Sequence, residues 1–219
     1  MTHRVPPPNA SIANKTEGSK KLFAPSAERN AQAICAALKT IAPEQGNALE
    51  LASGTGQHIV NLAKAIPNIQ WQPTEVDHDR IASIQAYIDG TDCNNINKPI
   101  FLDAAQSGWS STLGPMNLVS LSNLLHLISE QEAETLIAET AATLLPGGLF
   151  FLYGPFKRSG ELISQGDNDF DTSIRASAPN TGYKDDQLVI SQATNCGFAL
   201  EQAIEMPANN LALVFGKVE

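Results

Sequence analysis

The chain has 219 residues, of which 42% are hydrophobic and 17% charged, and its net charge is −9. This length and composition suit one globular domain with a full core. The acidic balance disfavours nucleic acid as a partner, because a negative surface repels phosphate backbones. Three widely spaced cysteines without a CxxC pair disfavour a disulfide framework or a metal site. The chain has neither a secretory signal nor an apolar run of transmembrane length, which predicts a cytoplasmic protein with no membrane partner.

Secondary-structure patterns alternate along the chain after a polar start. Residues 1–22 are rich in Pro, Asn, Ser and Lys, and we predict a flexible or loosely docked N-terminal tail there. Apolar residues then recur at helical spacing from Ser26, which can cap a helix, to Pro43, which stops it. Further apolar runs predict seven strands, with helical periodicity in most of the gaps between them. The expected strands are residues 47–51, 69–75, 100–103, 116–121, 149–153, 198–206 and 211–218, and the expected helices are residues 57–66, 79–88, 129–145 and 184–196.

The order of these elements predicts the fold. Strands that alternate with helices favour a parallel sheet with right-handed crossovers. The last two strands are joined by residues 207–210 without a helix, so they should form an antiparallel pair. We therefore predict a doubly wound, mostly parallel seven-stranded α/β sheet of the Rossmann-like type with an antiparallel C-terminal hairpin strand. Residues 159–181 form a long insertion on the ligand side of this sheet, and we expect a lid there.

A glycine-rich loop, ELASGTG at residues 50–56, follows the first expected strand and opens a helix. Ligands of open α/β sheets lie beyond the carboxyl ends of the strands, and glycines let a ligand approach the backbone. A dinucleotide fingerprint needs a third glycine where Ile59 stands, so that fingerprint is broken. An acidic residue before a short glycine run, as in methyltransferases, fits better, with Glu50 near the methionine amino group of S-adenosylmethionine (SAM). A tight turn without a ligand is the alternative. The loop residues expected to contact SAM are Ser53, Gly54 and Gly56.

Two further acidic residues follow the next two expected strands. Glu75 can accept hydrogen bonds from both ribose hydroxyls of a nucleotide, although Asp77 competes for this role. Either residue could instead simply cap the following helix. Asp103 can accept from an adenine amino group, with Ala104 beside it, or can form a turn. Together with the glycine loop, these acidic residues favour an adenosine-containing cofactor.

Several longer strings carry a family resemblance: FAPSAERN, GTGQH, YGPFK and MPANNL. They resemble the predicted SAM-dependent methyltransferases of the methyltransferase-like 26 type. The resemblance begins near Phe23 and continues to the C-terminus, so we expect a methyltransferase domain over residues 23–219. It implies the class I methyltransferase fold and SAM as cofactor, but no particular acceptor. Ala52 stands where the wider superfamily usually has a glycine, which is acceptable if its φ is negative.

The acceptor should bind where the remaining strands end. Methyl transfer is an in-line displacement that depends on positioning and desolvation, so it requires no nucleophile on the protein. His126 is a candidate general base. The alternative is a structural histidine whose ring nitrogens are hydrogen-bonded to backbone groups. Arg29 could pair with the methionine carboxylate of SAM, or could be a solvated helix end. The catalytic candidates are His126, Tyr153 and Asn123, of which Asn123 is also a cofactor contact; the acceptor-binding candidates are Tyr153, Phe156, Lys157, Asn209 and Asn210.

These features favour a SAM-dependent methyltransferase that acts on a small-molecule acceptor. A compact domain without a basic groove suits a small acceptor better than a nucleic acid. A non-catalytic SAM-binding or interaction module is an alternative, because methyl transfer needs no obligatory catalytic residue. An NAD-dependent oxidoreductase is less favoured, because the third glycine of the dinucleotide fingerprint is missing.

Overall fold

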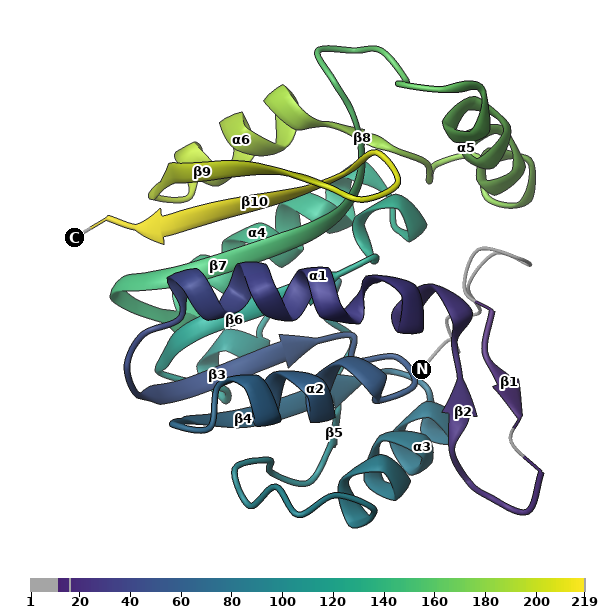
Figure 1. The fold of residues 1–219 in the computed structure, drawn as a ribbon. Coiled ribbons are helices and arrows are strands. Elements are labelled where there is room, and N and C mark those ends of the chain that lie inside the picture. The colour runs from purple at the N-terminus through teal and green to yellow at the C-terminus, as the bar shows by residue number, and fades with distance from the viewer. Residues whose placement is uncertain (1–11, 16, 219) are drawn as a thin grey trace.

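The computed structural model describes residues 12–15 and 17–218. A central sheet has helices on both faces (Figure 1). Its strand order is β5-β4-β3-β6-β7-β10-β9, and β8 pairs with the end of β7. The strands are β3 (Gly46–Leu51), β4 (Ile69–Glu75), β5 (Ile100–Phe101), β6 (Met116–Ser122), β7 (Leu144–Lys157), β8 (Lys184–Asp185), β9 (Phe198–Met206) and β10 (Asn210–Lys217).

The strand directions confirm the predicted fold. Strands β3 to β7 run parallel, whereas β10 is antiparallel to both β7 and β9. From β3 the chain winds outward to β4 and β5, then returns to β6 on the other side of β3. This reversal leaves a crevice at the carboxyl ends of β3 and β6, which is where doubly wound sheets bind ligands.

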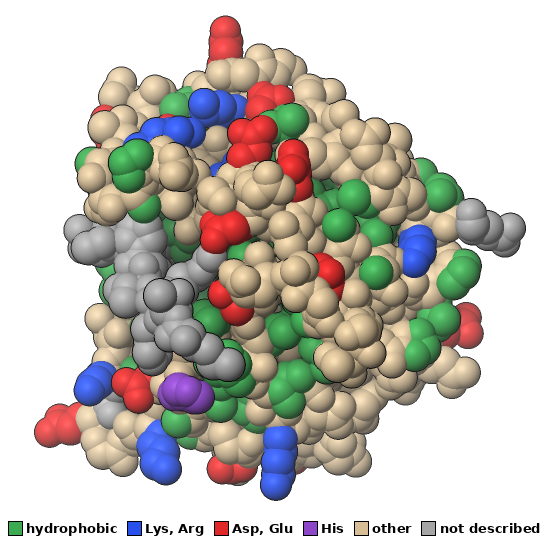
Figure 2. Space-filling model, turned by 180° about the vertical axis from the view of Figure 1, so that it is seen from behind, with side chains coloured by type: hydrophobic (Ala, Val, Ile, Leu, Met, Phe, Trp, Pro, Cys, Tyr) green, Lys and Arg blue, Asp and Glu red, His purple; other side chains and the backbone are tan. Residues whose placement is uncertain are grey.

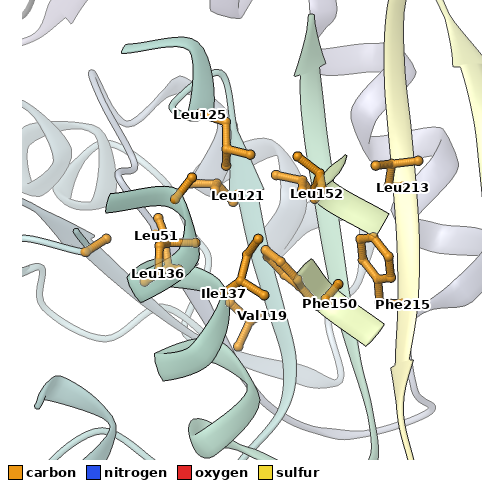
Figure 3. Packing of buried hydrophobic residues seen from close by; sticks show 14 of the residues in the cluster. Leu51, Val119, Leu121, Leu125, Leu136, Ile137, Phe150, Leu152, Leu213 and Phe215 are labelled. Carbon is orange, nitrogen blue, oxygen red and sulfur yellow. The ribbon is translucent and has the colours of Figure 1, made fainter. Parts of the chain in front are cut away.

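Each face of the sheet buries its own core. The helices are α1 (Pro25–Ile41), α2 (Gln57–Ala65), α3 (His78–Asp89), α4 (Glu130–Thr143), α5 (Gln165–Ser177) and α6 (Asp186–Asn195). Apolar residues of α1, α2 and α3 pack on one face, and those of α4 and α6 pack on the other. Figure 3 shows the second core, where Leu136 of α4 lies beside Leu51 and Ile137 lies beside Val119 and Phe150. None of the helices in the described ranges combines the length and apolarity needed to cross a bilayer.

Strand β7 is longer at both ends than the expected residues 149–153. It begins at Leu144, directly after α4, and Pro146–Gly148 form an irregular stretch in which Gly147 has a φ of 74° and the pairing with β6 shifts register. At its other end, pairing with β10 extends to Pro155, and Phe156 and Lys157 pair with β8. The residues after Tyr153 therefore lie in the sheet and not in the loop that the sequence had suggested.

The described part of the N-terminal segment contacts α3, which the prediction of a loosely docked segment allows. Residues 1–11 lie outside the described part of the chain, but β1 (Asn14–Lys15) and β2 (Leu22–Phe23) form an antiparallel pair. Leu22 N–H donates to Ser83 Oγ of α3 at 2.7 Å, and the Tyr87 hydroxyl donates to Leu22 O at 3.2 Å. The described part of the segment is thus docked on α3.

Helix α1 begins at Pro25, two residues earlier than a cap at Ser26 would place its start. Ala24 is the N-cap residue, and no side chain caps the helix. Proline at the first helical position is favourable, because its missing N–H is one of the groups that a helix start leaves unpaired. The Ala24 N–H donates to Gln57 Oε1 at 2.7 Å, so tertiary structure supplies the missing cap.

Candidate functional site

A cavity of about 440 Å³ opens at the carboxyl ends of β3, β4 and β6. Its volume falls in the range of small-molecule sites, and it lies at the reversal of the strand order where a ligand is expected. Acidic side chains gather in the middle of the molecular face drawn in Figure 2, and basic ones lie toward its edges. Among the described residues, the charged ones that line this cavity are acidic apart from one arginine. They are Glu75, Asp77, Asp103, Glu132 and Arg80.

The glycine loop forms the floor of the cavity and is tied to β4. Ser53 N–H donates to Thr74 O at 2.8 Å, and Thr74 N–H donates back to Ser53 Oγ at 3.2 Å. Gly54 N–H donates to Glu75 Oε2 at 2.9 Å. Ser53 and Gly54 line the cavity as expected for a ligand-binding loop.

Gly56 has a different role from the one expected. Its φ is 96°, and a Cβ on it would lie 2.8 Å from the Cα of Ile84 in α3. The glycine therefore permits close packing between the loop and α3, because any side chain would collide with the helix backbone. Gly56 is not among the described residues that line the cavity.

Ala52 adopts a conformation opposite to the one expected. Its φ is 51°, in the left-handed region, whereas the sequence interpretation required a negative φ. The expectation was wrong because the loop keeps the backbone path that a glycine would take. An alanine in this region costs on the order of 1 kcal/mol. The rest of the loop therefore holds Ala52 in a strained state at the edge of the cavity.

Glu75 links the loop to the start of α3. Its Oε1 accepts from Val76 N–H at 2.7 Å, and its Oε2 accepts from Gly54 N–H. Burial raises the pKa of Glu75, while Arg80 and these hydrogen bonds act in the opposite direction. Asp77, the competing candidate, is the N-cap residue of α3 and accepts from Arg80 N–H at 3.0 Å. Both acidic residues line the cavity.

The opposite wall combines polar and apolar groups. Asp103 follows β5 and accepts from Ala105 N–H at 3.0 Å in a tight turn. Asn123 follows β6 with a φ of 58°, and its N–H donates to Tyr153 O at 2.9 Å. Asn tolerates the left-handed region better than most residues. The structure thus brings Asp103, Ala104 and Asn123 to one cavity beside apolar residues, which are Leu102, Leu124, Leu127 and Ile128.

Glu50 lies one layer behind the cavity. Its side chain is 4% exposed, and burial raises its pKa to about 8, with a further rise from Glu75. Its Oε2 has no hydrogen-bond partner among the described residues. An unpaired buried carboxyl oxygen next to an acidic cavity fits a cationic ligand such as the sulfonium and ammonium groups of SAM.

Residues expected at the acceptor end of β7 are mostly buried away from the cavity. Tyr153 is 1% exposed, and burial raises its pKa, while a hydrogen bond to Asn30 lowers it. Phe156 lies in the apolar core, and Lys157 is half-buried within β7. Neither residue lines the cavity formed by the described parts of the chain. They were nominated because β7 was expected to end at Tyr153, and the longer strand turns them elsewhere.

Three other expected site residues also lie outside the cavity lining. Arg29 is exposed on α1. Asn209 donates to Asp167 Oδ2 of α5 at 3.0 Å, and Asn210 donates to Pro207 O at 2.9 Å within its own turn. The turn chemistry of the two asparagines explains their presence without a ligand.

His126 is buried behind the cavity in an aromatic cluster. It belongs to a 3₁₀ turn, Leu125–Leu127, and its ring lies 5.9 Å from that of Phe170 and 6.2 Å from that of Tyr183. Burial and the nearby Lys184 lower its pKa to about 3, so the imidazole is neutral at physiological pH. Its own side chain does not line the cavity, although its neighbours Leu127 and Ile128 do.

The insertion at 159–181 contains α5, which was not predicted. Ser164 caps the helix, and Arg175 pairs with Asp171 at 2.7 Å. Gly182 N–H donates to His126 O at 2.9 Å, which ties the segment to the turn beside the cavity. The cavity lining within the described chain does not include residues 159–181, and the lid function stays a prediction.

Sequence reasoning missed the contacts between α1 and the loop. Gln57 accepts from Ala24 N–H and donates to Glu28 Oε2 at 3.0 Å, and His58 Nε2 lies 2.7 Å from Asn30 Oδ1. Burial lowers the pKa of His58 to about 4. Helix α1 thereby brings its first turn to the cavity. The signal was the occurrence of FAPSAERN and GTGQH together, since these two strings form the contact.

The strand order, the antiparallel β10 and the crevice beside the glycine loop are those of the class I methyltransferase fold. Residues 21–217 match the family described as "Protein of unknown function (DUF938)", and the chain belongs to that family.

Solved structures share this fold. Human N-acetylserotonin methyltransferase in complex with SAM has a TM-score of 0.73 at 13% identity, covering 89% of this chain and 53% of that one. An O-methyltransferase family protein from Burkholderia thailandensis has a TM-score of 0.73 at 14% identity, covering 89% of this chain and 57% of that one. Mitomycin 7-O-methyltransferase MmcR has a TM-score of 0.75 at 10% identity, covering 88% of this chain and 54% of that one. The chain spans about half the length of these proteins, and the likeness shows the fold alone.

Proposed function

We propose that this protein is a SAM-dependent methyltransferase that acts on a small-molecule acceptor. The observation that carries this proposal is the cavity at the reversal of the strand order, where Glu75 and Asp103 meet the Ser53–Gly54 loop. Human N-acetylserotonin methyltransferase, which shares the fold, was solved with SAM. The sequence strings support a more specific assignment to the methyltransferase-like 26 type.

The residues that line the cavity suit the parts of SAM. We assign Glu75 to the ribose hydroxyls and Asp103 to the adenine amino group, because carboxylate oxygens accept such hydrogen bonds. The apolar side chains beside Asp103 suit the adenine faces. Bound SAM would supply an electrophilic methyl group, and the chain's own task would be to orient the acceptor and exclude water.

Of the three catalytic candidates, Asn123 lines the cavity, whereas His126 and Tyr153 lie behind it. We therefore propose that the Asn123 amide orients the acceptor. The neutral imidazole of His126 would act on the acceptor only after the turn at Leu125–Leu127 moves.

Calorimetric titration tests the cofactor assignment. Asp103→Ala should weaken SAM binding about 10- to 100-fold, because a hydrogen bond to a charged group contributes about 1.5–3 kcal/mol. Asp92→Ala is the matched control, since Asp92 is exposed and away from the cavity lining. Binding of NAD without binding of SAM would overturn the proposal.

A separate assay tests catalysis. Transfer of a labelled methyl group from SAM to a component of a metabolite extract is expected from the wild-type protein. Tight SAM binding with no transfer to any component would favour the alternative of a non-catalytic SAM-binding module.

A further inference from the structure

The turn after β6 forms one wall of the cavity, and it has little local structure to hold it in place. Leu124, Leu127 and Ile128 of this turn line the cavity. The turn contains the 3₁₀ helix Leu125–Leu127, which is three residues long. Short 3₁₀ helices have poor hydrogen-bond geometry, so contacts with other segments are needed to fix their place. The position of this wall therefore depends on what lies behind it.

The segment from Gly182 to Lys184 supplies such contacts from outside the cavity. Gly182 N–H donates to His126 O at 2.9 Å, and Lys184 Nζ donates to Ile128 O at 2.7 Å. Both acceptors are backbone carbonyls at the end of the 3₁₀ helix, where a helical turn leaves carbonyl groups without a partner of its own. Neither Gly182 nor Lys184 is among the described residues that line the cavity. The two residues therefore hold the wall without lining the cavity themselves.

Lys184 is an unusual group for this task, because its ammonium group is buried. The residue is 7% exposed, and Nζ donates to two carbonyl oxygens, Ile128 O and, at 3.0 Å, Gly182 O. In the described part of the chain, no salt bridge joins Lys184 to a carboxylate. The charged groups that act on it from a longer distance are Glu130 and Glu132 of α4 and Asp171 and Arg175 of α5. A buried charge without a directly paired carboxylate is costly. Its retention here indicates a function, and its contacts point to the cavity wall.

The same segment is also fixed to α5. Tyr183 N–H donates to Asp171 Oδ1 at 2.6 Å, and Arg175 Nε donates to Asp171 Oδ2 at 2.7 Å. A Cβ on Gly182 would lie 2.6 Å from both Arg175 Nε and Asp171 Oδ1, so the Gly182 backbone packs directly against this ion pair. Helix α5 and the cavity wall are therefore both hydrogen-bonded to one three-residue segment.

We propose that Lys184 is a positioning residue for the adenine end of SAM. Its ammonium group fixes the turn after β6 from behind, and thereby sets where Leu127 and Ile128 meet the adenine ring. This inference rests on the proposed function, in which these apolar residues lie beside the adenine. It adds that a buried cation outside the cavity controls the affinity for the cofactor.

Calorimetric titration with SAM tests this role. Lys184→Met keeps most of the apolar volume of the side chain and removes both hydrogen bonds. It should weaken SAM binding about tenfold, because a buried carbonyl that loses its donor lets the wall move. Lys184→Arg, which keeps a charged donor, should stay within about threefold of the wild-type Kd. Lys64→Met removes an exposed lysine of α2 that is not in the described cavity lining, and it should bind SAM as the wild type does. Titration well below the unfolding temperature leaves Kd insensitive to a loss of stability alone.

Adenosine locates the effect within the ligand. Because the wall lies at the adenine end, Lys184→Met should weaken adenosine binding by the same factor as SAM binding. An unchanged SAM Kd in this variant, or a loss of SAM affinity without a loss of adenosine affinity, overturns this inference and leaves the proposed function standing. Failure of SAM to bind the wild-type chain overturns the proposed function itself.

Hydrogen exchange of the wild-type chain decides the matter if Lys184→Met fails to fold. The amides of Gly182 and Tyr183 are hydrogen-bonded to the wall and to α5, outside the cavity lining of the described chain. A wall that is coupled to this segment should transmit the effect of the ligand, so SAM should slow the exchange of both amides about tenfold or more. Unchanged exchange of both amides in the SAM complex overturns the inference.

Discussion

Ala52 and Glu50 show, at the scale of single residues, that the loop after β3 is not arranged for stability. Ala52 is held in a left-handed conformation, and Glu50 has a carboxyl oxygen that finds no hydrogen-bond partner in the described part of the chain. Strain and unpaired polar atoms persist where the surrounding structure enforces them, and they gather at binding sites. Both residues therefore allow predictions that separate ligand binding from folding.

Replacing Ala52 by glycine should not destabilise the protein. The glycine relieves a backbone strain on the order of 1 kcal/mol, which offsets the entropy of about 0.4–1 kcal/mol that glycine adds to the unfolded chain. Ala86→Gly, in the interior of α3, should lose about 1 kcal/mol, because the alanine there is helical. Urea denaturation of both variants measures the difference. An equal loss in the two variants would show that the left-handed conformation costs nothing.

Replacing Glu50 by glutamine should stabilise the ligand-free protein, increasingly as the pH rises from about 5 to 8. The pKa of Glu50 is raised on folding, so the folded state binds the proton more tightly, and stability falls as pH rises from the unfolded pKa to about 8. Glutamine cannot ionise, so the variant does not lose stability in this way. Denaturation curves of the wild type and the variant at about pH 5 and pH 8 measure the difference in their free energies of unfolding.

The carboxylate of Glu139 provides a control of opposite sign. Hydrogen bonds from the Gly108 and Ser110 N–H groups lower its pKa despite an opposing effect of burial. The contribution of Glu139 to folding stability is therefore present above the pKa that its carboxyl group has in the unfolded chain, and it is lost as the pH falls. Glu139→Gln should be slightly destabilising at neutral pH and neutral in acid. A Glu50→Gln variant that behaves in this way would contradict the assignment of a protonated Glu50.

At the scale of elements, the docking of α1 on α2 and the sheet builds one wall of the cavity. Asn30 of α1 is hydrogen-bonded to His58 of α2 and to Tyr153 of β7. Ser26 and Ala27, in the first turn of the same helix, line the cavity. The helix start has no side-chain cap of its own, so these tertiary contacts determine where it lies.

Asn30→Ala should destabilise the protein by about 2 kcal/mol, although alanine is the better helix former. The substitution leaves buried polar atoms of His58 and Tyr153 without a partner. It should also weaken SAM binding, because the first turn of α1 loses its anchor. Asn61→Ala, on the exposed side of α2, should stay within about 0.5 kcal/mol of wild type. Denaturation and titration of both variants provide the check, and equal effects would exclude a positioning role for Asn30.

At the scale of the whole molecule, the order of the strands places the site. The acidic and glycine-loop residues belong to β3, β4 and β5 and to the turns after them. They meet Asn123, which follows β6, only because the chain reverses beside β3. A ligand in this crevice contacts both halves of the sheet, so binding should stabilise the fold as a unit.

A ligand-induced shift of the unfolding temperature tests this expectation. SAM at about 100 times its Kd should stabilise the native state by about 2.7 kcal/mol. For a domain of this size the gain corresponds to a rise in Tm of about 5–10 °C. S-adenosylhomocysteine should also raise Tm, whereas NAD should not. A shift with NAD alone would favour the oxidoreductase alternative.

Local patterns were enough to predict the fold. Apolar runs marked the buried parallel strands, and α4 opens with a capping box between Ser129 and Glu132, which are three residues apart in the chain. The absence of a helix between β9 and β10 predicted their antiparallel pairing. These features depend on neighbouring residues and on alternation along the strand, which a single sequence contains.

The sequence by itself therefore determined the order of the elements, the glycine loop and the acidic residues at the strand ends. Only the tertiary structure decided which of them reach the cavity: Ser53, Gly54, Glu75, Asp103 and Asn123 do, whereas Gly56 packs on α3, Glu50 lies behind the loop, and Tyr153 and Phe156 are buried. The physical reason is that exposure depends on pairing between segments far apart in the chain. Strand β7 continues past Tyr153 because β10 and β8 supply its hydrogen bonds, and no local pattern contains that information.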